Sequence, residues 1–331
     1  MKEEDIRPEA LFNQYLSLAQ QDAITYFKNK PYYRIACPAC GSENNSFQFQ
    51  KIGFDYEECE LCKTLFVNPR PHGDAFSEFY FDSPSVRFWA TNFYKETENS
   101  RRIRLIQPKA HLVKNYIEKY YNSDNDDSCI LDIGAGYGVF CEELQKILKI
   151  GIPVIAIEPA QSLQKICHEK GITTIPKFFE DVITDDLNGK KIVAATSFEL
   201  LEHLHDPEVF IEHCSRLLSP GSLLIMTTLN WQGFDLQVLR DKSNSIFPPA
   251  HINFFTPSSL AILLERHGFD ICELSTPGKL DVDIVAKRPD LIKNPFIKII
   301  ASGDETMKND FQIFLQKSNL SSHMMVVARK R

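Results

Sequence analysis

The sequence lacks the long apolar segments that mark membrane and secreted proteins. No run approaches the roughly 18 apolar residues that a membrane-spanning helix needs, so neither a membrane span nor a membrane partner is expected. The first residues, MKEEDIRPEALFNQYL, have neither the basic n-region nor the apolar h-region of a signal peptide. We therefore expect a cytoplasmic protein.

Long basic blocks, internal repeats and low-complexity segments are also missing. The formal net charge is −7, and the lysines and arginines form no long block, although a local patch stays possible. Because nucleic-acid binding depends on clustered positive charge that neutralises phosphates, we do not expect a nucleic-acid partner. Hydrophobic residues make up 43% of the 331 residues, which indicates a globular chain long enough for one full-sized core and a small extra module.

Cysteine is plentiful, and four of the nine cysteines form two close pairs. CPAC contains Cys37 and Cys40, and CELC contains Cys59 and Cys62, with 18 residues between the pairs. This C-x₂-C spacing is typical of structural zinc sites, in which four thiolates complete a closed tetrahedral shell. Disulfides are the alternative, but a reducing cytoplasm disfavours them. We therefore predict a structural Zn²⁺ ion.

Short apolar runs alternate with amphipathic stretches from about residue 128. CILDIG, PVIAIEP, KIVAATS and SLLIMTTL are expected to form strands, and VFCEELQKILKI, AQSLQKICHEK, DPEVFIEHCSRLLS and PSSLAILLERHG to form helices. This rhythm predicts a doubly wound α/β fold with a mostly parallel sheet and helices on both faces. SHMMVVARKR is expected to add an antiparallel strand at or near the sheet edge.

Changes in composition divide the chain into four parts. Residues 1–30 predict a helix, and residues 31–72, aromatic and turn-rich, hold the cysteine pairs. Residues 73–121, rich in Phe, Tyr and Arg, predict a connector of two or three helices. Residues 122–331 form the expected α/β domain, with a helical insertion at about 287–320.

A glycine-rich turn follows the first strand of this domain, at the point where open α/β sheets bind ligands. LDIGAGYG has Gly134, Gly136 and Gly138, whereas a dinucleotide fingerprint needs G-x-G-x-x-G and would place its third glycine at Val139. Asp132 lies two residues before the first glycine, where a carboxylate suits a cation better than a pyrophosphate. S-adenosylmethionine has an ammonium group and no phosphate, so it fits these residues better than a dinucleotide.

Further cofactor contacts are expected at the ends of the following strands. Glu158, in AIEP, is placed to accept hydrogen bonds from both ribose hydroxyls, although dinucleotide folds share this feature. Phe179, Glu180 and Asp181 are placed to flank adenine and accept its amino group, and the alternative for the two acids is a solvated loop. Ser197, at the end of KIVAATS, completes the predicted set.

These motifs resemble class I S-adenosylmethionine-dependent methyltransferases, and most of all their ubiquinone-type O-methyltransferase branch. LDIGAGYG, AIEPA, SFELLEHLHDP, RLLSPGSLLIMTT and HINFFTPSSLAILLERHGF occur in the family's order over roughly residues 105–285. Ser222 departs from the usual second glycine. The resemblance implies a Rossmann-like fold and methyl transfer. The cysteine segment is similar to a zinc-ribbon prefix that precedes some such enzymes, and we expect it to shape the acceptor side or to contact a protein.

Proton removal from a hydroxyl acceptor would need a histidine or a carboxylate close to the bound acceptor. Glu199, Glu202 and His203, in SFELLEH, are spaced to share one face of a helical turn. They orient the cofactor, or His203 is the base, or they bind a divalent ion that polarises the hydroxyl. The E-x-x-E-H phrase is similar to the metal-binding phrase of ubiquinone-type and small-RNA 2′-O-methyltransferases, which implies Mg²⁺. His251, in PPAHINFF, is the other candidate base, or a loop histidine bonded to backbone.

A small-molecule acceptor is expected, a sugar or nucleotide-linked sugar, methylated on oxygen or, as second choice, on carbon. Trp231, Phe234 and Phe247 would form a wall of the acceptor pocket. Two other functions remain open: a catalytically inactive scaffold that uses the zinc ribbon for docking, and an RNA methyltransferase. The intact glycine turn argues against the scaffold, and the acidic balance argues against RNA.

Overall fold

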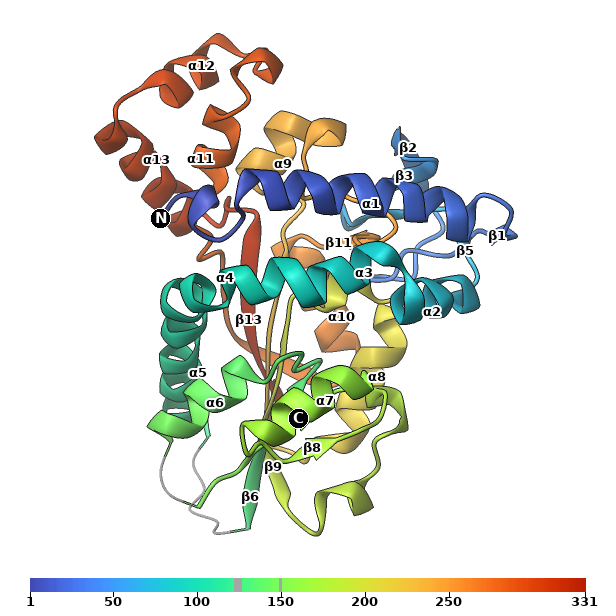
Figure 1. Ribbon diagram of the computed structural model, residues 1–331, viewed down its shortest axis with the longest axis vertical. Coiled ribbons are helices and arrows are strands. Elements are labelled where there is room, and N and C mark those ends of the chain that lie inside the picture. The colour runs from blue at the N-terminus through green and yellow to red at the C-terminus, as the bar shows by residue number, and fades with distance from the viewer. Residues whose placement is uncertain (122–126, 149–150) are drawn as a thin grey trace.

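A seven-stranded sheet forms the centre of the computed structural model, which describes residues 1–121, 127–148 and 151–331 (Figure 1). Its strand order is β12-β13-β10-β9-β6-β7-β8. The strands are β6 (Ser128–Ile133), β7 (Val154–Ile157), β8 (Thr174–Ile175), β9 (Lys191–Phe198), β10 (Leu223–Leu229), β12 (Phe269–Ser275) and β13 (His323–Lys330). The strands β6 to β10 run parallel, and β13 runs antiparallel to its neighbours β10 and β12. The edge strand β12 was not anticipated.

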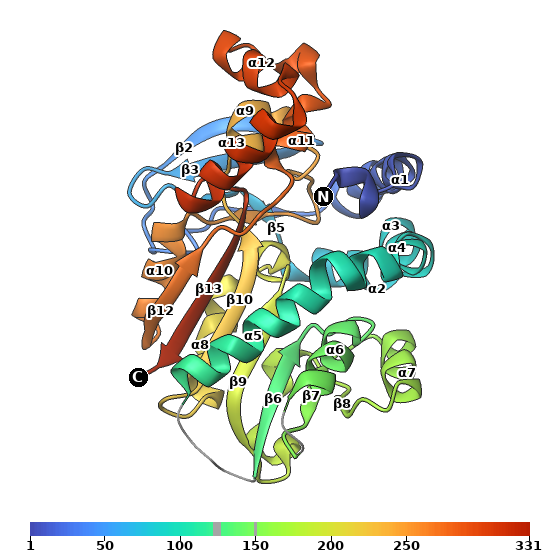
Figure 2. The same cartoon turned by 90° about the vertical axis from the view of Figure 1, so that its left-hand side faces the viewer.

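Helices cover both faces of this sheet, as the alternation of apolar strands and amphipathic stretches predicted (Figure 2). One face packs against α5 (Gln107–Tyr120), α6 (Val139–Ile147) and α7 (Gln161–Glu169), and the other against α8 (Pro207–Leu217) and α10 (Pro257–Arg266). The central strands are buried along their whole length because both faces are covered. The predicted helix VFCEELQKILKI extends at its end into residues outside the described ranges.

The cysteine-rich segment forms a small sheet after the helix α1 (Glu9–Phe27). The strands of this segment are β1 (Tyr32–Tyr33), β2 (Asn45–Lys51), β3 (Phe54–Cys59), β4 (Leu65–Val67) and β5 (Arg70–Pro71), of which β1 and β5 pair separately in a two-stranded sheet. The strand β4 pairs with β11 (Asn253–Phe254), which gives the order β11-β4-β3-β2. This sheet, called the ribbon sheet below, therefore includes a strand from far along the chain.

The connector crosses above the carboxyl ends of the parallel strands (Figures 1 and 2). After α2 (Gly73–Asp82) comes one continuous helical run from Pro84 to Tyr120. It consists of α3 (Pro84–Phe88), a π-helical turn η2 (Trp89–Tyr94), α4 (Lys95–Arg101), a second π-helical turn η3 (Arg102–Ile106), and α5. Such π turns are frequent at functional sites.

A helical segment between β12 and β13 projects from the top of the molecule (Figure 1). It consists of α11 (Asp281–Ala286), α12 (Pro295–Ser302) and α13 (Glu305–Lys317), so it begins before residue 287. Its base packs on α9 (Phe234–Leu239), where the carboxyl groups of Asp235 and Asp281 are both buried. Burial and the charge of Asp281 raise the pKa of Asp235 to about 8. Over the described ranges, no helix is long and apolar enough to cross a membrane.

Candidate functional site

The glycine turn lies between β6 and α6, with φ of +73° at Gly134, +55° at Gly136 and +66° at Gly138. Glycine tolerates these left-handed conformations because it has no Cβ. A Cβ on Gly138 would lie 2.5 Å from Cδ1 of Ile172 and 2.9 Å from Sγ of Cys167, whereas a Cβ on Gly136 would meet nothing within 4 Å. Gly138 is therefore required for packing, and Gly136 faces open space that a ligand can enter.

Two buried carboxylates flank this turn at the ends of β6 and β7. Asp132 accepts a hydrogen bond from the Thr196 hydroxyl at 2.8 Å, and burial raises the pKa of Asp132 to about 6. Glu158 accepts hydrogen bonds from the backbone amides of Gly136 at 2.8 Å and Ala160 at 2.9 Å. The predicted cofactor carboxylates thus lie beside the turn, and Glu158 binds the turn itself.

The adenine side of the predicted site needs one correction. The ring of Phe179, in η4 (Phe179–Asp181), is buried against Phe210 at 5.2 Å and His213 at 4.8 Å between ring centroids. It belongs to the core because the turn directs it onto α8. The exposed ring is that of Phe178, which is 64% exposed. The neighbouring acids Glu180 and Asp181 are exposed.

Glu199 follows β9 and adopts a left-handed φ of +52°, a strained conformation for a non-glycine residue. Its carboxylate accepts a hydrogen bond from the Thr227 hydroxyl at 2.6 Å and lies 2.6 Å from Nε2 of His323. Burial would raise the pKa of Glu199, but His323, Lys109 and the Thr227 hydrogen bond together hold that pKa well below its usual range. Glu199 is therefore ionised, and its carboxylate is engaged by the Thr227 hydroxyl and the His323 ring. Ser197 is buried within β9.

His323 is a site residue that the sequence interpretation missed. It begins β13, which is antiparallel to β10, so its position coincides with the carboxyl end of that strand at Leu229. The expected antiparallel direction of SHMMVVARKR contained this signal, since the first residue of such a strand must lie at the ligand edge of the sheet.

His203 and His251 form a pair whose ring centroids are 4.7 Å apart. Nδ1 of His203 lies 2.9 Å from the carbonyl oxygen of Ala250. Nδ1 of His251 lies 2.6 Å from the carbonyl oxygen of Ser245. Because a carbonyl only accepts, each Nδ1 is assigned the proton, which leaves a lone pair on each Nε2. Burial lowers the pKa of both rings, that of His251 to about 3. Both histidines are therefore neutral, and each presents the lone pair of Nε2 to a hydrogen-bond donor or a metal.

Glu202 joins this pair from η6 (Leu201–His203). It is buried and accepts a hydrogen bond from the Thr228 hydroxyl at 2.8 Å, and burial and the charge of Glu199 raise its pKa to about 8. Ligand atoms of Glu202, His203 and His251 all lie within 4.8 Å of one another. Two imidazoles and one carboxylate suit a first-row ion such as Mn²⁺ or Zn²⁺ better than Mg²⁺, which prefers oxygen ligands.

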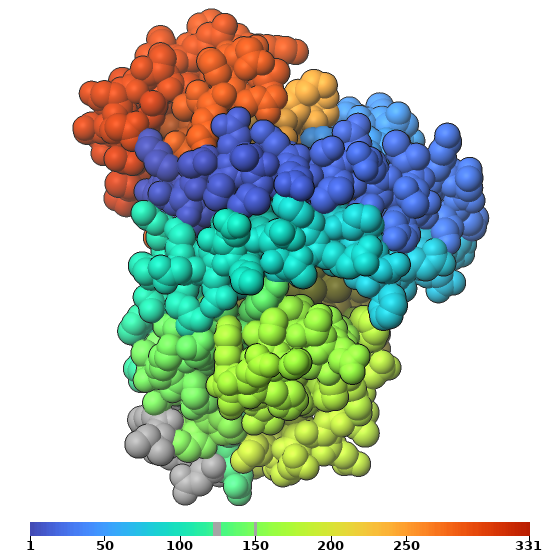
Figure 3. Space-filling model, in the orientation of Figure 1, coloured from blue at the N-terminus to red at the C-terminus, as the bar shows by residue number. Residues whose placement is uncertain are grey.

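Connector residues form the other side of the site, and no sequence motif pointed to them. Nζ of Lys109 lies 4.4 Å from the ring centroid of Phe198, beside the end of β9. The Arg101 guanidinium lies 5.7 Å from each of the rings of Trp89 and Tyr94. Burial lowers the pKa of both cations. Figure 3 shows the surface hollowed between these connector helices (teal) and the region of α7 (lime).

The predicted aromatic wall is only partly assembled. Phe247 lies 6.3 Å from Tyr15, which in turn lies 4.9 Å from Trp89. Trp231 instead donates a hydrogen bond to Glu58 of the ribbon sheet at 2.8 Å. Phe234 packs edge-on against Phe311 at 5.2 Å. The wall expected from Trp231 and Phe234 is therefore wrong, because both rings pack between secondary-structure elements.

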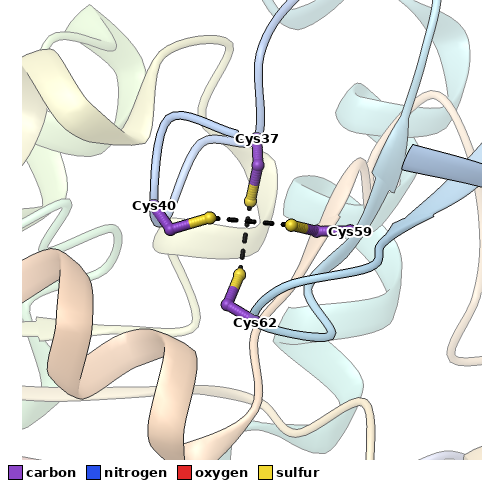
Figure 4. A group of neighbouring side chains, drawn as sticks. All are labelled: Cys37, Cys40, Cys59 and Cys62. Atoms are coloured by element: carbon purple, nitrogen blue, oxygen red, sulfur yellow. Dashed lines mark hydrogen bonds between the residues drawn. The ribbon is translucent and has the colours of Figure 1, made fainter. Parts of the chain in front are cut away.

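The four paired cysteines converge from two loops (Figure 4). The Sγ atoms of Cys37 and Cys62 are 3.4 Å apart, and those of Cys40 and Cys59 are 3.6 Å apart. A disulfide needs about 2.05 Å, so these thiols are free. All four lie within 4.8 Å of one another. Zinc–sulfur bonds of about 2.3 Å in a tetrahedron bring sulfur atoms to similar separations, so the cluster fits a zinc ion.

Comparison with known proteins places these features in a family. A model described as "Methyltransferase domain" matches residues 101–274. The ubiquinone biosynthesis O-methyltransferase of Nitrobacter winogradskyi is 29% identical over 156 residues, which are 44% of this chain and 58% of that enzyme. That of Colwellia psychrerythraea is 30% identical over 164 residues, 45% of this chain and 63% of the relative. Each alignment spans less than two thirds of the relative.

Solved structures agree on the fold. The plantazolicin methyltransferase BpumL, solved in complex with SAH, aligns with a TM-score of 0.50 at 16% identity, covering 77% of this chain and 94% of that one. The family match runs from the end of α4 through the glycine turn to β12 and covers more than half of the 331 residues. The chain therefore belongs to the family of methyltransferase domains.

Proposed function

We propose that the protein transfers a methyl group from S-adenosylmethionine to a hydroxyl group of a small metabolite. One observation carries the proposal: the glycine turn and the histidine pair lie at the same edge of one sheet. The region proposed to bind the cofactor is therefore next to the region proposed to accept the proton. Family membership supports the reaction type. Bound S-adenosylmethionine would supply an activated methyl group.

Residues of this chain suit each part of that cofactor. Gly136 leaves space above the turn, and Glu158 is placed to exchange its amide partners for ribose hydroxyls. Asp132 offers negative charge to the ammonium group, directly or through water. Lys109, whose charge acts on Asp132, offers positive charge to the carboxylate. Phe178 offers an exposed ring to adenine.

We propose His251 as the base that removes the acceptor proton. Its Nδ1–H donates to the Ser245 carbonyl, which orients the ring and leaves the lone pair of Nε2 for the acceptor. The acceptor we propose is a sugar or nucleotide-linked sugar. The guanidinium of Arg101 would suit the phosphates of a nucleotide-linked sugar.

The metal-assisted alternative rests on the close approach of Glu202, His203 and His251. In that case the trio would bind a divalent ion, which would polarise the hydroxyl. Chelation distinguishes the two mechanisms: we expect turnover to persist in EDTA if His251 is the base. Loss of turnover that Mn²⁺ restores would support the ion instead. We also propose that Cys37, Cys40, Cys59 and Cys62 hold a structural Zn²⁺ ion.

The proposal is tested by calorimetry with S-adenosylhomocysteine, followed by a labelled-methyl screen against nucleotide sugars. Binding together with label transfer is the expected result. Absence of binding at millimolar ligand would favour the inactive scaffold. Binding with label transfer to RNA, and not to small acceptors, would favour the RNA methyltransferase.

A further inference from the structure

The ribbon sheet continues directly into the segment that carries His251. In the antiparallel pairing of β4 with β11, Phe66 is opposite Asn253 and Leu65 is opposite Phe254. The backbone amide of Val67 also donates to the carbonyl of Ile252 at 2.9 Å. Backbone hydrogen bonds therefore connect this segment to the ribbon sheet, whose strand β3 ends at Cys59.

Tyr56 extends this contact to His251 itself. Its side chain, on β3, is fully buried, and its hydroxyl donates to the backbone carbonyl of His251 at 2.6 Å. Neighbouring rings of Phe49 at 5.2 Å and Phe254 at 6.1 Å confine it. Burial raises the pKa of the Tyr56 phenol well above its usual value, so it remains a donor.

The same segment is also bonded to the turn that carries His203. The amide of Ile252 donates to the carbonyl of Glu202 at 2.9 Å, and the Asn253 side-chain amide donates to that of Leu204 at 2.7 Å. Residues 251–253 therefore lie between the ribbon sheet on one side and the His203 turn on the other.

Arg70 closes this arrangement from the ribbon side. It is fully buried, and its guanidinium donates to the carbonyl of His205 at 2.6 Å and to the side-chain oxygen of Asn253 at 2.9 Å. The cysteine loops contact the chain that follows β11, since the Arg266 guanidinium donates to the carbonyl of Ala39 at 2.8 Å. Contacts from the ribbon thus reach both histidine-bearing segments.

We propose that Tyr56 is a positioning residue for the His203–His251 pair, and that the cysteine module is the scaffold of the acceptor side of the site. The importance of this positioning for catalysis rests on the function proposed above. The hydrogen bond between Tyr56 and the His251 carbonyl is independent of that function. Removing the phenol hydroxyl leaves the His251 carbonyl without its buried donor, which costs enough free energy for the segment to move.

The test compares Tyr56→Phe with the matched control Tyr116→Phe. The Tyr116 hydroxyl donates to Glu273 at 2.9 Å, between α5 and β12 and away from the ribbon sheet. Histidine ring signals are recorded by ¹H–¹⁵N NMR on selectively labelled full-length protein and assigned with His203→Gln and His251→Gln. In Tyr56→Phe we expect the His203 and His251 signals to move and the His168 signal, on α7, to stay.

Unchanged signals of His203 and His251 in Tyr56→Phe, or equal movement in Tyr116→Phe, would overturn the proposal. If Tyr56→Phe does not fold, Arg70→Lys serves as the second variant, with the same two signals as readout. Calorimetry with S-adenosylhomocysteine separates the two proposals, because the affinity should stay within about twofold in Tyr56→Phe. If the wild-type protein binds no S-adenosylhomocysteine, the proposed function is refuted. The NMR result would still decide whether Tyr56 positions the two histidines.

Discussion

Alanine at two glycines of one turn should produce opposite defects. Gly136 and Gly138 both have a left-handed φ, +55° and +66°, so alanine at either position costs about 1–2 kcal/mol of folding free energy. The added methyl group differs in its surroundings. At Gly136 it enters open space, whereas at Gly138 it would lie 2.5 Å from Ile172 and 2.9 Å from Cys167.

Overpacking of a core typically adds about 1–3 kcal/mol, so Gly138→Ala should lose about 2–5 kcal/mol and Gly136→Ala only about 1–2 kcal/mol. Ligand affinity should show the reverse order. The open space above Gly136 is where we propose the cofactor, so Gly136→Ala should weaken S-adenosylhomocysteine binding by about tenfold or more, or about 1.4 kcal/mol. Folded Gly138→Ala protein should bind within a few-fold of wild type.

Urea unfolding and calorimetry at one temperature measure both quantities, each variant serving as the control for the other. Wild-type affinity in Gly136→Ala would refute the placement of the cofactor over this glycine. Equal destabilisation of the two variants would refute the packing argument for Gly138.

Three further predictions concern the metal, the buried acids and the base. Cys59→Ser should reduce zinc from one ion per chain to substoichiometric levels in metal analysis, because the shell loses a thiolate; retention of a full zinc ion would contradict ligation by the four cysteines. The folded state keeps a proton on Asp235 that the unfolded chain releases, so stability should fall as pH rises from about 4 to about 8. Asp235→Asn should flatten that slope and add up to about 4 kcal/mol at pH 7, at about 1.4 kcal/mol per pH unit, in urea unfolding; a wild type with flat stability there would contradict it. His251→Gln should lower kcat by about 100-fold or more while S-adenosylhomocysteine affinity stays near wild type, and undiminished turnover would remove His251 from the mechanism.

Local patterns in the sequence accounted for the α/β domain, and they are also the basis of the cofactor residues, which stay predictions. Apolar strands, amphipathic helices and the spacing of Gly134, Gly136 and Gly138 are properties of short segments, so they can be read without knowledge of the fold. The carboxylates Asp132 and Glu158 followed from the rule that parallel strands end at one edge. The cysteine pairs were equally local, since each pair is one turn of chain.

Tertiary structure alone decided the acceptor side. His323 reaches Glu199 across 124 residues of sequence, and the carboxylate proposed as a candidate base lies against this histidine ring. Whether Phe178 or Phe179 faces outward depends on how a three-residue turn packs on α8. Asn253–Phe254 likewise joins the ribbon sheet because the edge of β4 is available to pair with it in the folded protein. Such contacts join distant segments through packing, and the periodicity of a single segment contains no information about its partner.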